Sequence, residues 1–153
     1  MKYKTIGAYK SVQNIPYCKA TVDVKVGMGV ILDRAAKTAA LPADESEAKA
    51  CHRIVSNIND KPEMHNFIET VVVREGEYVR ADDLKTVANL EIEFADAEIN
   101  GGVDSVEAGD TLVFGTDGLI VKSTAVDDYA VYFEVIEKTA YMGKGILAVI
   151  RAQ

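Results

Sequence analysis

The fold class is decided by the stretch Thr111–Lys122, which reads TLVFGTDGLIVK. Apolar and β-branched residues fill both ends of this stretch, as is typical of paired strands. Between them lies Asp117-Gly118, a dipeptide that can supply the positive φ angles of a tight turn. The pattern predicts a β-hairpin over residues 111–122.

The same strand pattern extends along the chain on both sides of this hairpin. Residues Ala20–Val26 alternate polar side chains with valines, the period of two that is typical of a half-buried strand. We therefore expect about seven short strands in all. Besides Ala20–Val26, the runs with a β-branched or aromatic bias are Val30–Leu32, Ile68–Val73, Leu90–Phe94, Thr111–Phe114, Tyr129–Ile136 and Gly145–Ile150.

Turn signals punctuate the strands, and helix signals are scarce. Turns are expected at Arg74–Glu77, Asn100–Gly102 and Gly143–Gly145. Short helices are indicated at Pro42–Lys49 and at Asp83–Ala88, the second of which would be capped by Asp82. The expected fold is mainly β: a compact β-barrel or β-sandwich with hairpins, one or two short helices and an extended N-terminal arm. The arm spans residues 1–19, and a single β-rich domain spans residues 20–153.

A weak internal repeat aligns Val24–Asp33 with Val106–Gly115. The shared pattern is Val-x-x-Gly-x-x followed by three apolar residues. It predicts two similar hairpins, each with a strand end, a glycine turn and a returning strand. Duplication and coincidence both remain open as its origin.

Size and charge restrict the class of protein. The 153 residues suit one domain, and no apolar run has the length of a membrane-spanning helix or of a signal peptide. The net charge of −7 argues against nucleic acid as a partner, because phosphate binding requires clustered Lys and Arg. Charge is unevenly placed: residues 1–26 hold five lysines and one aspartate, whereas residues 91–110 hold seven acidic residues and no Lys or Arg. The acidic segment is interpreted either as a solvated face or as a surface that meets the basic arm of a neighbouring subunit.

Catalytic and metal-binding signals are weak. Cys18, Cys51, His52 and His65 lack the close pairs that make a zinc site specific. The two cysteines are expected to stay reduced. The glycine clusters lack the flanking residues of a phosphate-binding loop. We therefore expect no catalytic residue, no metal and no cofactor. No residue pattern in the sequence supports an enzymatic function.

The N-terminal arm carries the predicted contact surface. It mixes tyrosines and isoleucines with lysines and has no helical period, so it is too apolar for a typical disordered tail. Tyr and other large apolar groups are preferred anchors at protein interfaces, and extended arms can add a strand to a sheet edge. The alternative is an ordinary first strand of the domain itself. The residues predicted to bind a partner are Lys2, Tyr3, Lys4, Ile6, Tyr9, Lys10 and Tyr17.

The segment Val22–Ile58, with Val24–Gly27 leading into Val30–Asp33 and then the alanine-rich run Ala35–Ala40, resembles small β-rich head decoration proteins of tailed bacteriophages. Val106–Asp110 is similar again. The resemblance implies a capsid cement protein that binds the outside of an assembled shell, across neighbouring subunits of the major capsid protein. It further implies a homo-oligomer, with a trimer favoured, located on the virion surface and made in the host cytoplasm. It supplies no catalytic residues.

Two other functions compete with this one. A β-barrel binding module for a small molecule or carbohydrate would have a concave pocket between sheets. A metal-dependent enzyme would be revealed by elemental analysis. Deleting residues 1–17 is expected to abolish shell binding but to spare a ligand pocket.

Overall fold

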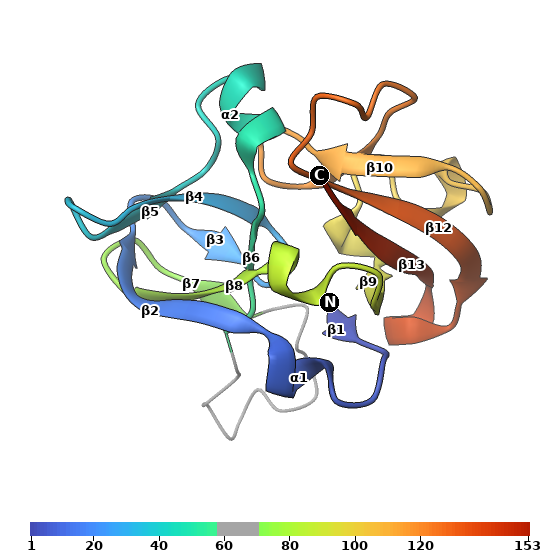
Figure 1. The fold of residues 1–153 in the computed structure, drawn as a ribbon, viewed down its shortest axis with the longest axis horizontal. Helices are drawn as coiled ribbons and strands as arrows, with labels where there is room; N and C mark the ends of the chain where they lie inside the picture. The colour runs from blue at the N-terminus through green and yellow to red at the C-terminus, as the bar shows by residue number, and fades with distance from the viewer. Residues whose placement is uncertain (58–70) are drawn as a thin grey trace.

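The computed structural model describes residues 1–57 and 71–153, which form two packed β layers (Figure 1). One layer is a closed barrel of order β2-β5-β4-β6-β8, and the other is an open six-stranded sheet of order β1-β9-β13-β12-β10-β11. A two-stranded ribbon joins β3 to β7. The strands are β1 Lys2–Tyr3, β2 Gln13–Ala20, β3 Val24–Lys25, β4 Gly29–Asp33, β5 Thr38–Ala40, β6 Arg53–Val55, β7 Val72–Val73, β8 Tyr78–Asp83, β9 Glu91–Ala95, β10 Thr111–Phe114, β11 Ile120–Lys122, β12 Val131–Thr139 and β13 Gly145–Ala152.

The helices are short. They are α1 Ala8–Ser11, α2 Glu45–Ala50 and the 3-10 turns η3 Leu84–Val87, η4 Asp96–Glu98, η5 Val103–Ser105 and η6 Tyr141–Gly143. The Asp44 carboxylate caps α2 by accepting a hydrogen bond from the Glu47 amide at 2.9 Å. η3 is capped by Asp83 rather than by the predicted Asp82. The mainly β fold class, with a closed barrel and two short α-helices, is thereby confirmed.

The hairpin predicted over 111–122 is formed by β10 and β11. Leu112 pairs with Lys122 and Phe114 with Ile120 in antiparallel register. At the turn, Gly118 has a φ of 76° and donates its amide to the Gly115 carbonyl at 3.0 Å. Only the glycine of the Asp-Gly pair takes a positive φ.

The alternating run Ala20–Val26 does not form one strand as predicted. β2 ends at Ala20, and the chain leaves the barrel through Thr21, whose amide bonds to the Ala39 carbonyl. It then enters the ribbon, where Val24 pairs with Val73. Val24 and Val26 are buried as the alternation requires, but Val22 is exposed. The predicted strand Ile68–Val73 lies partly outside the described residues, and its described part contains β7.

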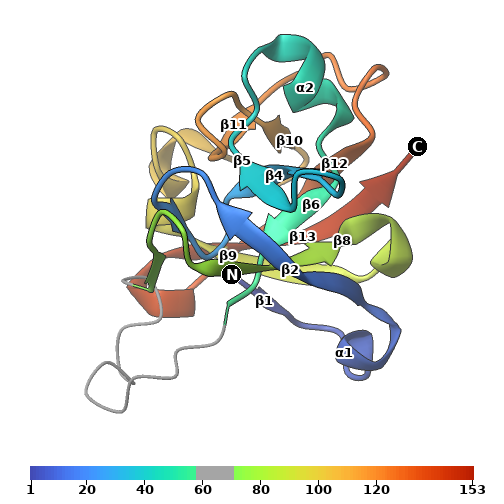
Figure 2. The same cartoon turned by 90° about the vertical axis from the view of Figure 1, so that its left-hand side faces the viewer.

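Residues 1–19 do not form an arm outside the domain. Lys2 and Tyr3 pair with Glu93 and Ile92 as the edge strand β1. Residues 13–20 form β2 inside the closed barrel, antiparallel to β8 and parallel to β5. In Figure 2, which looks at the barrel side, β2 crosses the front of the molecule above α1. The structure thus agrees with the alternative, in which this segment supplies the first strands of the domain.

The two layers enclose two cores of different composition. The barrel interior is filled by small side chains, which are Cys18, Ala20, Val24, Val30, Ala39, Val55, Val73, Val79 and Ala81. The core between the layers holds the large ones, with Phe133 in edge-to-face contact with both Phe94 and Phe114. A five-stranded barrel has room only for small residues inside, so the bulky residues gather between barrel and sheet.

The internal repeat corresponds to two turns with the same backbone hydrogen bonds. Gly27 and Gly109 have φ angles of 91° and 89°. The Gly27 amide donates to the Val55 carbonyl, and the Val55 amide donates back to Met28. In the second copy Val135 exchanges the same two bonds with Gly109 and Asp110. Each turn therefore locks onto one residue of a neighbouring strand.

A third turn of this kind, which the internal sequence repeat does not predict, lies at Val73–Tyr78. Gly76 has a φ of 82°, and Ala20 exchanges two backbone bonds with Gly76 and Glu77. In this copy Glu77 also accepts a hydrogen bond from the Arg74 amide at 2.8 Å, as Asp110 does from the Glu107 amide. The three turns lead into β4, β8 and β10. The same turn geometry therefore precedes two strands of the barrel and one strand of the six-stranded sheet.

The matched turns allow backbone strain to be separated from packing. An alanine Cβ at 109 meets no atom within 4 Å, whereas at 27 it would lie 2.5 Å from Glu98 Oε1. Gly109→Ala should therefore lower the free energy of unfolding by about 1–2 kcal/mol through the positive φ alone. Gly27→Ala should cost at least about 1 kcal/mol more, because a buried carboxylate must also move. Urea unfolding of both variants measures this difference, and equal losses would contradict it.

Candidate functional site

The predicted contact residues divide into exposed and buried groups. Ile6 is fully exposed at 101%, and the side chains of Tyr9 and Tyr17 are 60% and 45% exposed. Lys2, Lys4 and Lys10 are also exposed. Tyr3, in contrast, is only 5% exposed and belongs to the core between the layers. Tyr3 is therefore not available to a partner in this conformation.

The connection from β1 to β2, residues 4–12, is called here the N-terminal loop. Gly7 bends it with a φ of 90°, and a short helix follows that buries Ala8. The loop is held at both ends, because the Lys4 amide bonds to the Glu91 carbonyl and the Gln13 amide bonds to Thr86 Oγ1. Ile6 is thus an apolar side chain held in solvent on a short loop anchored to the domain.

Two of the predicted lysines are engaged within the chain itself. Lys2 Nζ and Lys4 Nζ lie 3.3 and 3.5 Å from the two carboxylate oxygens of Glu93. Lys2 Nζ also lies 5.2 Å from the ring centroid of Tyr141, a distance suited to a cation–π contact. Glu93 is only 4% exposed, so these lysines compensate a carboxylate on a crowded part of the sheet face.

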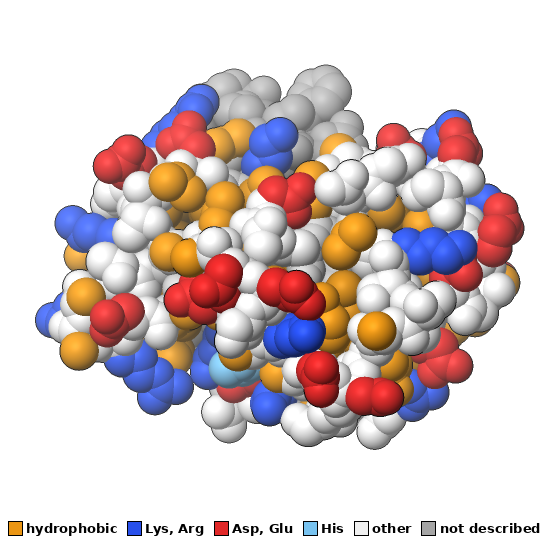
Figure 3. Space-filling model, turned by 90° about the horizontal axis from the view of Figure 1, so that it is seen from above, with side chains coloured by type: hydrophobic (Ala, Val, Ile, Leu, Met, Phe, Trp, Pro, Cys, Tyr) orange, Lys and Arg blue, Asp and Glu red, His pale blue; other side chains and the backbone are white. Residues whose placement is uncertain are grey.

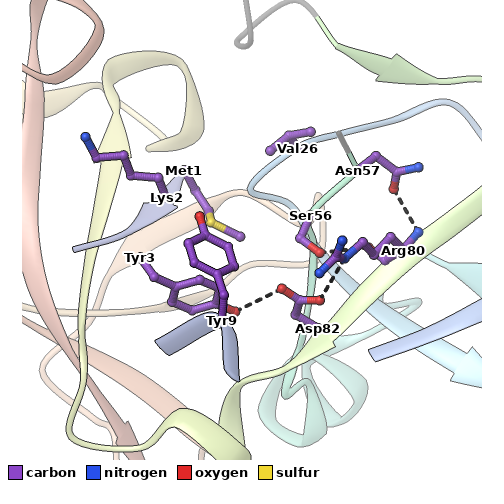
Figure 4. Close-up of a pocket in the computed structure, with 9 residues that line it drawn as sticks. All are labelled: Met1, Lys2, Tyr3, Tyr9, Val26, Ser56, Asn57, Arg80 and Asp82. Carbon is purple, nitrogen blue, oxygen red and sulfur yellow. Dashed lines mark hydrogen bonds and ion pairs between the residues drawn. The ribbon is translucent and has the colours of Figure 1, made fainter. Parts of the chain in front are cut away.

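Beside the loop, a cavity of about 180 Å³ opens between β1 and the barrel (Figure 4). Its lining includes Tyr3, Tyr9, Arg80 and Asp82. Asp82 is fully buried; it accepts a hydrogen bond from the Tyr3 hydroxyl at 3.3 Å and one from Arg80 Nε at 3.4 Å. The rings of Tyr3 and Tyr9 meet edge to face at 5.2 Å. The cavity therefore combines aromatic rings with one buried polar cluster at its side.

Sequence reasoning did not find this cluster. Asp82 was interpreted as a helix cap, although it lies in β8. A signal was available, since Val79 and Ala81 alternate with Arg80 and Asp82 in strand periodicity. Only the fold shows that the second face of β8 meets Tyr3, which is 79 residues away along the chain.

The polar cluster predicts a sensitivity to alkaline pH. Burial, followed by the nearby Asp82 carboxylate, raises the pKa of Tyr3 well above its usual range. Because the folded-state pKa is raised, the stability due to neutral Tyr3 is present below about pH 10, the unfolded value, and is lost as the pH rises beyond it. At about pH 8, Tyr3→Phe should reduce the free energy of unfolding by about 1–3 kcal/mol, since Asp82 loses a partner.

Urea unfolding at about pH 8 and about pH 11 tests the alkaline effect. The stability advantage of the wild type over Tyr3→Phe should shrink at the higher pH. Tyr17→Phe is the matched control, because Tyr17 is 45% exposed. A constant difference between wild type and Tyr3→Phe across this range would show that Tyr3 ionises normally.

The cysteines lie in different cores and are not paired. Cys18 is inside the barrel, and Cys51 is between the layers, where its thiol lies 3.6 Å from the Val30 and Arg53 carbonyls. His52 is half-buried, and its ring nitrogen Nδ1 faces the Ala50 carbonyl. His65 lies outside the described residues. Within 1–57 and 71–153, no group of three or more His, Cys, Asp or Glu side chains is arranged to hold a metal ion.

Thiol reactivity should follow this burial. Burial raises the pKa of the Cys51 thiol to about 12 and also raises that of Cys18. Only the thiolate reacts, so modification of the folded protein at about pH 8 should be at least about a hundredfold slower than that of a free thiol. Two thiols per chain should titrate once the protein is unfolded in guanidinium. Rapid labelling of the native protein, or fewer than two thiols after unfolding, would refute this assignment.

Comparison with protein-family models, curated proteins and solved structures finds no match for this chain. Across the described residues, the structure contains no helix with the length and apolar character needed to span a membrane.

Proposed function

We propose that this chain is a structural protein of a bacteriophage virion. It decorates and stabilises the capsid by binding the outer shell across neighbouring subunits of the major capsid protein. The observation that supports the proposal best is the exposed N-terminal loop with Ile6 at its tip and Tyr9 beside it. Burying an isoleucine side chain in a partner contributes about 1.5–3 kcal/mol, which the free protein forgoes.

The loop is suited to a contact of this kind because its ends are fixed. β1 belongs to the six-stranded sheet and β2 to the barrel, so the loop joins the two layers. A preorganised loop loses less conformational entropy on binding than a free arm does. Because residues 1–19 do not form an extended arm, the proposed contact is restricted to Ile6, Tyr9 and Lys10 of this loop.

Stabilisation of the shell would follow from mass action. A protein that binds only the assembled lattice stabilises it according to its affinity and occupancy. The repeated sites of a shell also supply avidity if the protein oligomerises. No chemical step is required.

A point substitution tests the contact, because deleting residues 1–17 would remove β1 and five of the eight residues of the barrel strand β2. Ile6→Asp should weaken co-sedimentation with shells that lack this protein by about tenfold or more, since a charge would replace the buried side chain. It should also remove the gain in shell heat resistance. Ile136→Asp is the matched control, as Ile136 is 40% exposed on β12, away from the loop.

Shell binding by Ile6→Asp at the wild-type level would remove the loop from the contact. Failure of the wild type to co-sediment or to raise shell heat resistance would reject the proposal itself.

The cavity favours a second candidate, a binding module for a small molecule or carbohydrate. Its walls combine Tyr3 and Tyr9 with the carboxylate of Asp82 and the guanidinium of Arg80. A ligand screen by thermal shift discriminates the two functions. A ligand of this cavity should lose its effect in Asp82→Asn but keep it in Ile6→Asp, whereas shell binding should show the opposite pattern.

A further inference from the structure

The β4–β5 hairpin ends in an exposed basic tip, formed by Arg34–Lys37 with Lys19 alongside. The four residues of the turn are all exposed. The Asp33 carboxylate holds the turn by accepting hydrogen bonds from the Ala35 and Ala36 amides at 2.8 and 2.9 Å. Lys19 is tied to the tip, because its amide bonds to the Lys37 carbonyl at 2.9 Å. The tip is a preformed turn with two small side chains between cations.

The cations of this tip have no acidic partner among the described residues. Lys19, Arg34 and Lys37 form no ion pair there, although Lys19 Nζ lies 5.2 Å from the ring centroid of Tyr78. In residues 91–153, by contrast, every Lys and Arg is paired: Lys122 with Asp110, Lys138 with Glu107, Lys144 with Asp104 and Arg151 with Glu134. The tip is therefore a local excess of positive charge on a chain whose net charge is −7.

A complementary acidic groove lies elsewhere on the same molecule, between α2 and the segment 127–130. The groove has a volume of about 450 Å³ and is lined by Ser46, Lys49, Asp127, Asp128 and Tyr129, among others. The Ala130 amide joins its walls by donating to the Lys49 carbonyl at 2.7 Å.

The groove and the adjoining start of α2 together carry an excess of negative charge. Asp44, Glu45 and Glu47 at the start of α2 add to the two aspartates of the lining. Lys49 is the one cation of the lining within the described chain, and it is already shared by Glu45 at 3.0 Å and Asp128 at 3.5 Å. Figure 3 shows red side chains around a blue one near the middle of this face.

The tip and the groove do not face each other within one molecule. In Figure 1 the β4–β5 hairpin lies at the left edge, whereas α2 lies at the top. We propose that the basic β4–β5 tip of one copy docks into the acidic groove beside α2 of a second copy of this chain. Because the two surfaces differ, the contact is head-to-tail and builds a ring or an open chain. It uses neither Ile6 nor the N-terminal loop, so it stands or falls separately from shell binding.

Sedimentation velocity over a concentration series tests the contact. The wild type should associate reversibly at low salt, and association should weaken by about tenfold or more as the salt rises to physiological ionic strength or above, where charges are screened beyond about 8 Å. Arg34→Glu with Lys37→Glu should abolish association, and so should Asp127→Lys with Asp128→Lys. A mixture of the two double variants should associate again, because both charges are then exchanged.

The matched control is Lys25→Glu with Lys138→Glu, which changes the same charge at two exposed lysines outside the tip. This control should associate as the wild type does. Circular dichroism of each variant verifies that it is folded. A wild type that stays monomeric at low salt, a tip variant that associates normally, or a mixture that remains monomeric would each overturn the proposal.

Discussion

The fold depends on a glycine turn that exchanges two backbone hydrogen bonds with a neighbouring strand. At Gly27, Gly76 and Gly109 the chain takes a positive φ that other residues adopt only at a cost. The partners Val55, Ala20 and Val135 lie in β6, β2 and β12, so the three turns fasten both layers. The valine that opens each motif is buried, which fixes the turn from the core side as well. One backbone constraint, used three times, sets where β4, β8 and β10 begin.

Much of the fold could be predicted from local patterns. The β10–β11 hairpin, the strand β9 and the last strand follow from β-branched residues between glycine turns. The closed barrel could not be predicted in detail, because β2 pairs in parallel with β5 and antiparallel with β8, and nothing local encodes partners so distant. The third turn does not match the pattern shared by the other two, because Arg80 interrupts the three positions that are apolar in both of them.

The N-terminal segment shows how one pattern permits two structures. Lys2-Tyr3-Lys4 reads equally well as a free basic arm and as an edge strand with one side chain inward. The structure shows the edge strand. Tyr3 donates a hydrogen bond to Asp82 and packs in the core between the layers, and Lys2 and Lys4 pair with Glu93. The sequence predicts Ile6 and Tyr9 as contact residues, but it does not show that a loop between the sheet and the barrel presents them. The acidic groove depends on α2 meeting residues 127–130, which the chain order does not suggest.

The position of β13 has a consequence for how the molecule is assembled. β13 lies between β9 and β12, at the middle of the six-stranded sheet. Before it is in place, β9 carries only β1, and β12 carries only β10 and β11, so the future sheet exists as two separate pieces. Each piece then presents an unpaired edge, which is a template for wrong pairing with another chain. The integrity of this sheet therefore depends on β13, which joins the two pieces and covers both edges.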